Sequence, residues 1–441
     1  MAGLRIGEVR AGLERGPAGE SMHRSVGDLY PVCRSITGDG LRQTLRYVAA
    51  RIPLALHEVP SGTEVLDWTI PREWNIRDAY IATSKGQRIV DFRQSNLHVV
   101  NYSAPVRARM SLRELAPHLH TLPEAPDWVP YRTSYYRESW GFCLSHRQMT
   151  ALPEDEYEVC IDSTLEPGAL TYGECYLPGA TSDEVLISCH VCHPSLANDN
   201  LSGIVLAMSL AERLRDCARR YSYRFLFIPG TVGSIAWLAL NEAAVDRIKH
   251  GLVLACVGDV GAFTYKKSRR GDAEVDRVVA HVLQERGGEY RIEDFSPYGY
   301  DERQFCSPGF NLPVGCFMRT PHGRFAEYHT SADNPSLVSP AALAESLDTG
   351  LAILEALEGN QRYLNLNPRG EPQLGKRGLY RSMGGYAQAG LDDLAVLWVL
   401  NLSDGEHSLL DIAHRSGRRF AAIRQAADLL EANGLLEELT K

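Results

Sequence analysis

The chain has 441 residues, 44% of them hydrophobic and 23% charged, which is the ordinary composition of a water-soluble globular protein. This length predicts two or three domains. The formal net charge of −9 argues against non-specific attraction to nucleic acid or to an acidic membrane face.

Targeting signals and disulfide patterns are absent from the sequence. No run of about 18 apolar residues predicts a membrane span. The first 21 residues carry charges but no apolar core of a secretory signal. We therefore expect a cytoplasmic protein. In that compartment the ten scattered cysteines, most of them inside apolar runs, are expected to be free buried thiols.

The first part of the chain divides into two zones of different composition. Residues 22–60 show helical spacing, most clearly in the segment 41–52, "LRQTLRYVAARI". Residues 61–157 are rich in Trp, Tyr, Pro and Arg, and short apolar runs there are broken by turn residues. This second zone predicts a small subdomain that consists mostly of β-strands.

From residue 158 to about 369, predicted strands and helices alternate. Strands are expected at 184–190, 223–230, 251–259 and 312–319, and helices at 201–216, 233–251, 273–287 and 340–359. Such alternation predicts an α/β domain with a mixed, largely parallel sheet flanked by helices on both faces.

The remaining sequence predicts a linker and a small helical domain. Residues 365–386 are rich in Gly and Pro, and the following residues have the element order of a winged helix. We therefore predict three parts: an α/β domain formed by 1–62 and 158–375, an inserted β-rich subdomain at 63–157, and a winged helix at 376–441. From residue 391 onward the sequence has nine acidic and five basic residues. This negative balance means that the winged helix is not expected to bind DNA.

The stretch "CHVCHPSLANDNLSG", residues 189–203, allows three interpretations. The pattern C-x-x-C-H is the attachment motif of c-type haem, but it follows the apolar run "VLISC", which predicts a buried strand. A zinc finger would need a second pair of ligands, and none is present. The third interpretation makes the histidines and Asp199 metal ligands, with Cys189 and Cys192 as small core residues.

Polar side chains recur where the predicted strands end, and ligands bind at that edge of an open α/β sheet. His190, His193 and Asp199 follow the first strand, and Asp259 ends the third. The loops around the fourth strand carry further acidic residues and a histidine: Asp301, Glu302, Glu327 and His329. This set of nitrogen and oxygen donors predicts a zinc site.

The segments "VLISCH", "ANDNLSGIVLAMSLAERL", "VGDVGAF", "YDERQF" and "YHTSADN" resemble zinc aminopeptidases of the aminopeptidase S and glutaminyl cyclase type. The sequence resembles still more closely a bacterial aminopeptidase-like family with a C-terminal winged helix. This resemblance covers the chain from about Met22. It implies that His190 is the first ligand, Asp199 a bridging ligand, Asp259 a second carboxylate ligand and His329 the distal ligand.

Two features depart from the peptidase pattern. His193 has no counterpart there; it either supports His190, replaces it as the ligand, or caps the loop. Peptidases of this type also carry two glutamates after the second strand, one as the general base and one as a ligand. Here "FIPGTVGS" places Gly230 and Thr231 near those positions.

The sequence thus predicts a zinc-dependent amide hydrolase of aminopeptidase type, with one or two Zn²⁺ ions, that acts on a small peptide or an aminoacylated metabolite. Because Gly230 cannot accept a proton, we expect Glu302 or Glu327 to supply the general base, with Glu302 favoured, and we count Asp301 as a further catalytic candidate. The alternative is a binding or assembly protein that retains the peptidase scaffold without its chemistry. A homo-oligomer without a membrane partner is expected in either case.

Overall fold

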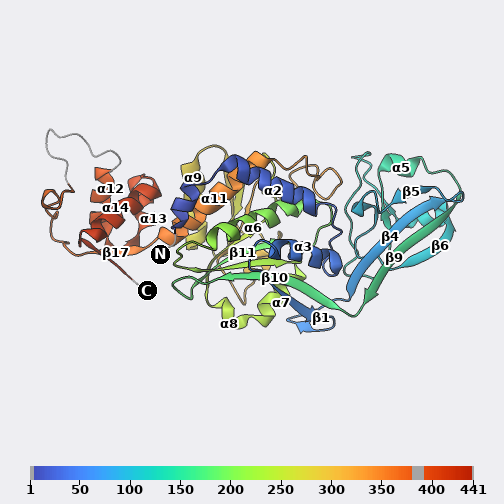
Figure 1. Cartoon of the computed structure of the whole chain (residues 1–441), viewed down its shortest axis with the longest axis horizontal. Helices are drawn as coiled ribbons and strands as arrows, with labels where there is room; N and C mark the ends of the chain where they lie inside the picture. The colour runs from blue at the N-terminus through green and yellow to red at the C-terminus, as the bar shows by residue number, and fades with distance from the viewer. Residues whose placement is uncertain (1–3, 380–391, 440–441) are drawn as a thin grey trace. The chain divides into compact units, whose positions relative to one another are not determined.

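The computed structural model describes residues 4–379 and 392–439 (Figure 1). The chain separates into two compact units. The large unit comprises Met1–Asp276 and Gly288–Leu351, and the small unit comprises Arg277–Gly287 and Ala352–Lys441. The ten cysteines are free thiols, as predicted.

A mixed sheet forms the centre of the large unit. Among the described residues it has eight strands in the order β1-β10-β12-β11-β13-β16-β14-β15. The four central strands β12, β11, β13 and β16 are mutually parallel, and β1, β10 and β14 join it by antiparallel pairing. The strands are β1 (Ala55–Pro60), β10 (Ala169–Leu177), β11 (Glu184–His190), β12 (Ser222–Ile228), β13 (Ile248–Leu254), β14 (Phe263–Lys266), β15 (Tyr290–Glu293) and β16 (Val314–Met318).

Helices cover both faces of this sheet. In Figure 1, α2 and α6 lie on one side of it and α7 and α8 on the other. Every residue of β11 and β12 is buried, as expected for parallel strands that pack on both faces. The helices of the large unit are α1 (Ile6–Ala11), α2 (Arg15–Leu29), α3 (Asp39–Ala49), α6 (Ser202–Leu214), α7 (Val232–Leu240), α8 (Glu242–Val245), α10 (Glu302–Phe305) and the first part of α11 (Pro340–Gly359), whereas α9 (Glu274–Arg286) belongs mostly to the small unit.

The predicted fold class is confirmed, with two local differences. The predicted helix 233–251 is shorter, because β13 already begins at Ile248. That strand ends at Leu254, so Asp259 lies five residues beyond it, in a loop.

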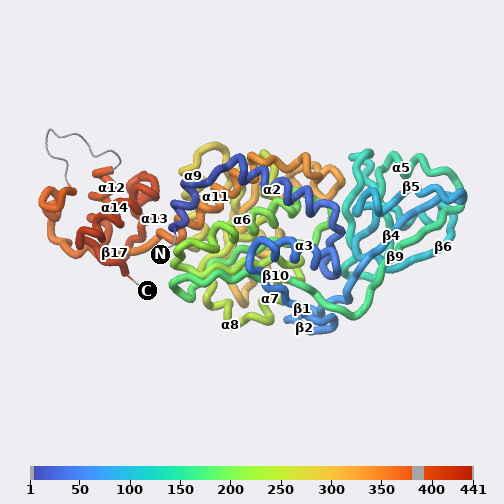
Figure 2. Tube along the Cα trace, in the orientation of Figure 1, coloured from blue at the N-terminus to red at the C-terminus, as the bar shows by residue number. Residues whose placement is uncertain are grey.

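The residues between β1 and β10 form a second, antiparallel sheet with the order β5-β4-β9-β6. The tube in Figure 2 shows β4, β9 and β6 side by side, and β9 leads directly into β10 of the central sheet. A separate apolar cluster, which includes Phe142 and Tyr157, forms its core. The larger elements are β4 (Glu73–Thr83), β5 (Arg88–Asp91), β6 (Val106–Ser111), α4 (Leu112–Leu115), α5 (His146–Thr150) and β9 (Glu156–Glu166).

The short hairpin β2 (Glu64–Val65) and β3 (Trp68–Thr69) precedes β4. Its inner residues Val65 and Ile70 are buried in the same apolar cluster as Trp237 of α7. The hairpin is therefore fixed to the central α/β layer, and Trp68 at its end is left partly exposed. Two further short strands, β7 (Leu119–His120) and β8 (Phe142–Cys143), pair in parallel.

The small unit has the predicted winged-helix elements: α12 (Asp393–Leu402), α13 (Leu409–Ser416) and α14 (Phe420–Ala432), with a three-stranded sheet. Its central strand β17 (Arg362–Asn365) pairs with β18 (Asp404–Ser408) and β19 (Leu436–Glu438). The predicted boundary at 375/376 therefore falls after the first strand of this sheet. The predicted linker lies partly outside the described residues.

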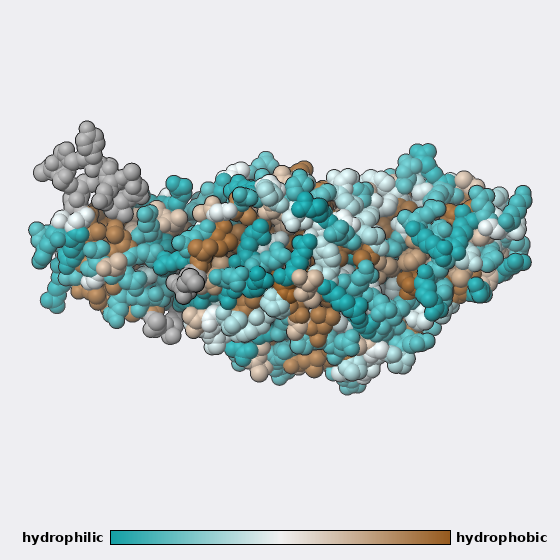
Figure 3. Space-filling model, in the orientation of Figure 1, coloured by the Kyte–Doolittle hydropathy of each residue, from teal (hydrophilic) through white to brown (hydrophobic). Residues whose placement is uncertain are grey.

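Hydrophilic residues cover most of the face drawn in Figure 3, and hydrophobic residues there form separate patches. Over the described ranges, no helix has both the length and the apolar character needed to cross a bilayer.

A buried ion-pair network ties β11 to its neighbours. Glu184, at the start of β11, is fully buried and accepts hydrogen bonds from Arg224 Nε at 2.6 Å and Arg247 Nε at 2.8 Å.

We expect Glu184→Ala to lower the free energy of unfolding by about 3–5 kcal/mol, because it removes one of the carboxylates that neutralise the buried Arg224 guanidinium. Asp183→Ala is the matched control: Asp183 is half exposed and pairs with Lys249 at 3.9 Å, so its loss should cost less than about 1 kcal/mol. Urea unfolding would compare the two, and equal losses would contradict the prediction.

Candidate metal centre

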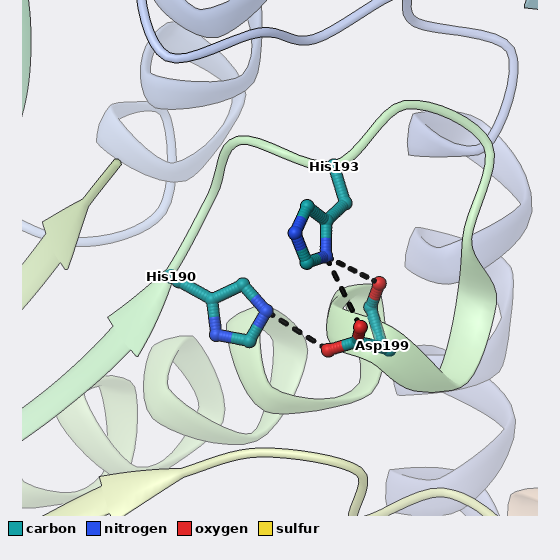
Figure 4. A group of neighbouring side chains, drawn as sticks. All are labelled: His190, His193 and Asp199. Carbon is teal, nitrogen blue, oxygen red and sulfur yellow. Dashed lines mark hydrogen bonds and ion pairs between the residues drawn. The ribbon is translucent and has the colours of Figure 1, made fainter. Parts of the chain in front are cut away.

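His190, His193 and Asp199 come together at the carboxyl end of β11 (Figure 4). His190 is the last residue of β11, and His193 lies on the loop that follows. Asp199 lies in the irregular turn Ala197–Leu201, directly before α6. The three side chains offer ligand atoms that all lie within 4.8 Å of one another.

The Asp199 carboxylate lies between three imidazoles. Its Oδ1 is 2.9 Å from His190 Nε2, and its Oδ2 is 3.2 Å from His193 Nδ1 and 3.0 Å from His329 Nε2. Tetrahedral ligands at about 2.1 Å from one zinc ion are separated by roughly 3–4 Å, so these contacts have the right scale. With one oxygen toward His190 and the other toward His193 and His329, the carboxylate is also suited to bridging two ions.

The protonation states suit a cation. Burial lowers the pKa of His190 and of His329, which favours the neutral imidazole that binds metals. Although burial opposes it, the charge of His193 and the hydrogen bond from His190 hold the pKa of Asp199 well below its usual range. For His193, burial is outweighed by the Asp199 carboxylate, which raises its pKa well above the usual value. The neutral imidazoles of His190 and His329 and the ionised Asp199 carboxylate therefore suit zinc as they stand, whereas His193 has to release a proton to bind it.

Aromatic rings hold the imidazoles in place. Tyr300 stacks on His190, with ring centroids 5.0 Å apart, and Tyr328 stacks on His329 at 3.9 Å. Tyr131 packs edge-on against His193 at 5.2 Å and against His329 at 5.0 Å. Tyr300 and Tyr328 were not expected as part of the site from the sequence, although each directly precedes a predicted site residue.

Asp259 does not join this group. Its Oδ1 accepts hydrogen bonds from Thr320 Oγ1 and Gly261 N, both at 2.6 Å, and its Oδ2 accepts from Asn198 Nδ2 at 3.0 Å. Both oxygens therefore already have hydrogen-bond donors, and Oδ2 holds the loop that carries Asp199 through Asn198. We leave Asp259 out of the ligand set on this ground and regard it as a positioning residue.

Asp333, which the sequence did not single out, supports the same loop. Its carboxylate accepts hydrogen bonds from the backbone N–H of Asn198 at 2.6 Å and of Asp199 at 3.0 Å. Burial raises its pKa to about 7. Asp333 lies four residues after His329 in the segment "YHTSADN", so that segment supplies both a metal-facing histidine and the support of the facing carboxylate.

The three predicted acidic candidates have different surroundings. Asp301 lines a pocket of about 150 Å³ together with His190, His193 and His329. Glu302 is fully buried and forms an ion pair with Lys266 of β14, and it does not line this pocket. Glu327 is partly exposed and is likewise not among the described residues that line it. The structure therefore favours Asp301, whereas the sequence had favoured Glu302.

Asp301 has one oxygen available for chemistry. Its Oδ1 accepts a hydrogen bond from Ser234 Oγ at 2.9 Å, while its buried Oδ2 has no hydrogen-bond partner among the described residues. Burial raises the pKa of Asp301 to about 7, and the nearby Glu302 adds to this effect. A Cβ placed on Gly230 would lie 3.2 Å from Asp301 Oδ2 and 3.2 Å from His190 Cβ. The Asp301 carboxylate thus borders the space that a side chain at position 230 would enter.

The fold of the large unit is that of an aminopeptidase-like protein. Solved structures with the same fold include a zinc aminopeptidase from Bacillus subtilis (TM-score 0.55, 12% identity, 76% of this chain and 94% of that chain). Another is a peptidase M28 precursor from Shewanella amazonensis (TM-score 0.54, 12% identity, 78% of this chain and 96% of that chain). At such identities the likeness shows the fold alone.

The chain belongs to the family described as "Domain of unknown function (DUF4910)", whose model matches residues 23–360, and a winged helix-turn-helix model matches 361–438. A Clostridium acetobutylicum protein is 52% identical over 419 residues, which are 95% of this chain and 96% of that protein. That protein is named as a provisional polysaccharide biosynthesis protein with an aminopeptidase-like domain. A crystal structure of a provisionally assigned peptidase from the same organism matches with a TM-score of 0.92 and 50% identity, over 96% of this chain and 97% of that chain.

Proposed function

We propose that the chain is a zinc-dependent amide hydrolase of aminopeptidase type. The observation that carries this proposal is one pocket lined both by His190 and His193, which form a metal-ligand group with buried Asp199, and by Asp301, a carboxylate with an unpartnered oxygen. A hydrolase of this type needs both a cation and a proton acceptor within one site.

In this proposal His190, His193 and Asp199 hold zinc, with His329 on the second oxygen of Asp199. When bound, zinc supplies Lewis-acid chemistry toward an amide carbonyl and toward water. Asp301 accepts a proton at Oδ2 from the attacking water, whose oxygen bonds to the acyl carbon. As the C–N bond breaks, that proton passes to the departing nitrogen, so a carboxylic acid and an amine leave the site.

Lys266 positions the loop that carries Asp301. It pairs with Glu302 and donates hydrogen bonds to the carbonyls of Tyr298 at 2.9 Å and Ser296 at 3.3 Å. In this proposal the Glu302 carboxylate therefore acts through the fold of the loop and not on the substrate.

The fold and the pocket support a proposal for the substrate class. Peptidase-like neighbours and a pocket of about 150 Å³ favour a small peptide or aminoacyl compound. The name of the Clostridium relative suggests that such a compound belongs to polysaccharide biosynthesis. A cytoplasmic location and a homo-oligomer remain predictions from the sequence.

The second candidate is a binding protein that retains the scaffold without turnover, and Gly230 and Thr231 in place of acidic residues favour it. Purified full-length protein, stripped with a chelator and reloaded with zinc, would separate the two. We expect stoichiometric zinc and zinc-dependent release of amine from a panel of aminoacyl and N-acyl amides. Bound zinc without turnover of any amide would favour the binding protein, and failure to bind zinc would overturn the metal centre itself.

A further inference from the structure

A second pocket opens beside the metal centre. It has a volume of about 110 Å³ and shares Gly230 and Thr231 with the pocket that contains the metal ligands. A compound whose reacting bond lies at the metal ligands can therefore extend past Gly230 into this second space, which we call the aromatic pocket because Trp68, Tyr135 and Tyr136 line it.

The side chains of the aromatic pocket are apolar or neutral. Trp68 and Tyr136 meet edge to face with ring centroids 5.9 Å apart, and they are 37% and 79% exposed. Among the described residues that line this pocket none is charged, and Thr69 and Thr231 contribute hydroxyl groups. Large aromatic side chains that remain exposed at a pocket are typical of a binding surface. The lining is thus suited to an uncharged group with one apolar face.

A row of tyrosines connects the aromatic pocket to the metal ligands. Tyr131, which packs against His193 and His329, is hydrogen-bonded through its hydroxyl to the Tyr135 hydroxyl at 2.9 Å. The Tyr135 ring is in turn 6.4 Å from that of Tyr136, and its hydroxyl donates to Asn101 Oδ1 at 3.2 Å. Hydrogen bonds and ring packing fix this wall, so little side-chain entropy is lost when a ligand binds against it.

We propose that the aromatic pocket binds a neutral sugar ring of the substrate, so that the hydrolysed amide is one attached to a monosaccharide. This rests on the proposed hydrolase function. A sugar ring presents an apolar C–H face to an indole and keeps its hydroxyl groups toward water and the two threonines, which an open pocket allows. The volume of about 110 Å³ is smaller than that of a cavity of about 150 Å³ that accepts benzene, so the pocket holds one face of a single six-membered ring and leaves its substituents outside.

The other occupant of similar shape is an aromatic amino-acid side chain. Burial in a closed apolar cavity would suit it better, whereas Tyr136 is largely exposed. A phosphorylated sugar or a nucleotide would require a cationic side chain, and the described lining offers none.

Binding can be measured without turnover. N-acetylglucosamine and phenylalaninamide are titrated into the full-length chain carrying Asp301→Asn, and calorimetry or ligand-observed NMR reports the affinity. We expect N-acetylglucosamine to bind, and Trp68→Ala to weaken it by about tenfold or more, on the scale of a lost aromatic contact. Trp68→Phe should retain most of the affinity, which guards against a general folding defect.

Tyr290→Ala is the matched control, because Tyr290 on β15 is also 37% exposed and lies outside the pocket. It should leave binding unchanged. Absence of N-acetylglucosamine binding, equal binding in wild type and Trp68→Ala, or Trp68-dependent binding of phenylalaninamide alone would each overturn the sugar proposal. Trp68-dependent sugar binding in a protein that hydrolyses no amide would support this inference while overturning the proposed hydrolase function.

Discussion

Asp199→Asn will remove most of the zinc from the protein. The Asp199 carboxylate is completely buried and gives one oxygen to His190 and the other to His193 and His329. An amide side chain keeps this shape but loses the negative charge and one of the two oxygen donors. Second-layer substitutions at metal sites cost about 10–100-fold in affinity, so we expect this ligand substitution to cost at least about 100-fold.

Competition with a chromophoric chelator would measure this loss directly. Thermal unfolding gives an independent reading, because a ligand that binds only the folded state stabilises it. Zinc should raise the Tm of the wild type and leave that of Asp199→Asn unchanged. Asp333→Asn is the control: it keeps every ligand and weakens only the support of the loop, so its loss of affinity should be smaller. Unchanged zinc content in a folded Asp199→Asn protein would place the metal elsewhere.

The fold of the large unit was predictable because its pattern is local. Strands such as Glu184–His190 and Ser222–Ile228 are short apolar runs between amphipathic helices, and this alternation alone requires a sheet covered on both faces. The metal group was predictable for the same reason. His190, His193 and Asp199 lie within ten residues of one another, so one strand end and one loop bring them together.

The remaining parts of the site depend on contacts between distant segments. Asp301 and Glu302 are neighbours at the start of a four-residue helix, and no periodicity distinguishes the one that faces the pocket. The distinction comes from Lys266 on β14, which binds Glu302, and from the absence of a side chain at Gly230, which leaves room beside Asp301. The strand end at Asp259 was not predictable either, because β13 stops at Leu254 and the next five residues form a loop.

The inserted sheet likewise has features that could not be predicted because they depend on contacts between distant segments. Its β-rich character was predicted from composition, but the position of Trp68 and Tyr136 beside Gly230 joins three segments that are far apart in sequence. The aromatic residues could equally have formed only the core of the subdomain. Only their exposed fractions and their shared pocket distinguish the two roles.

Asp301→Asn will lower kcat by about 10²–10⁴-fold and leave zinc bound. The substitution keeps the hydrogen bond from Ser234 and the size of the side chain, but an amide cannot accept the proton. General-base catalysis contributes about 10²–10⁴-fold, so kcat should fall by that factor. Glu302→Gln should instead weaken the Lys266 ion pair, and its effect on activity should accompany a loss of stability. If Glu302→Gln lowered kcat while Asp301→Asn stayed fully active, Glu302 and not Asp301 would be the general base.

The pH dependence of kcat/KM gives an independent test of Asp301 as the general base. Burial raises the pKa of Asp301 to about 7, with Glu302 adding to the rise and Arg303 and His193 opposing it. A bound cation also favours the ionised carboxylate. Wild-type kcat/KM should therefore increase with pH, with the midpoint of the rise at or below about pH 7, as Asp301 loses its proton. The residual activity of Asp301→Asn should lack this limb, and an unaltered profile would show that another group accepts the proton.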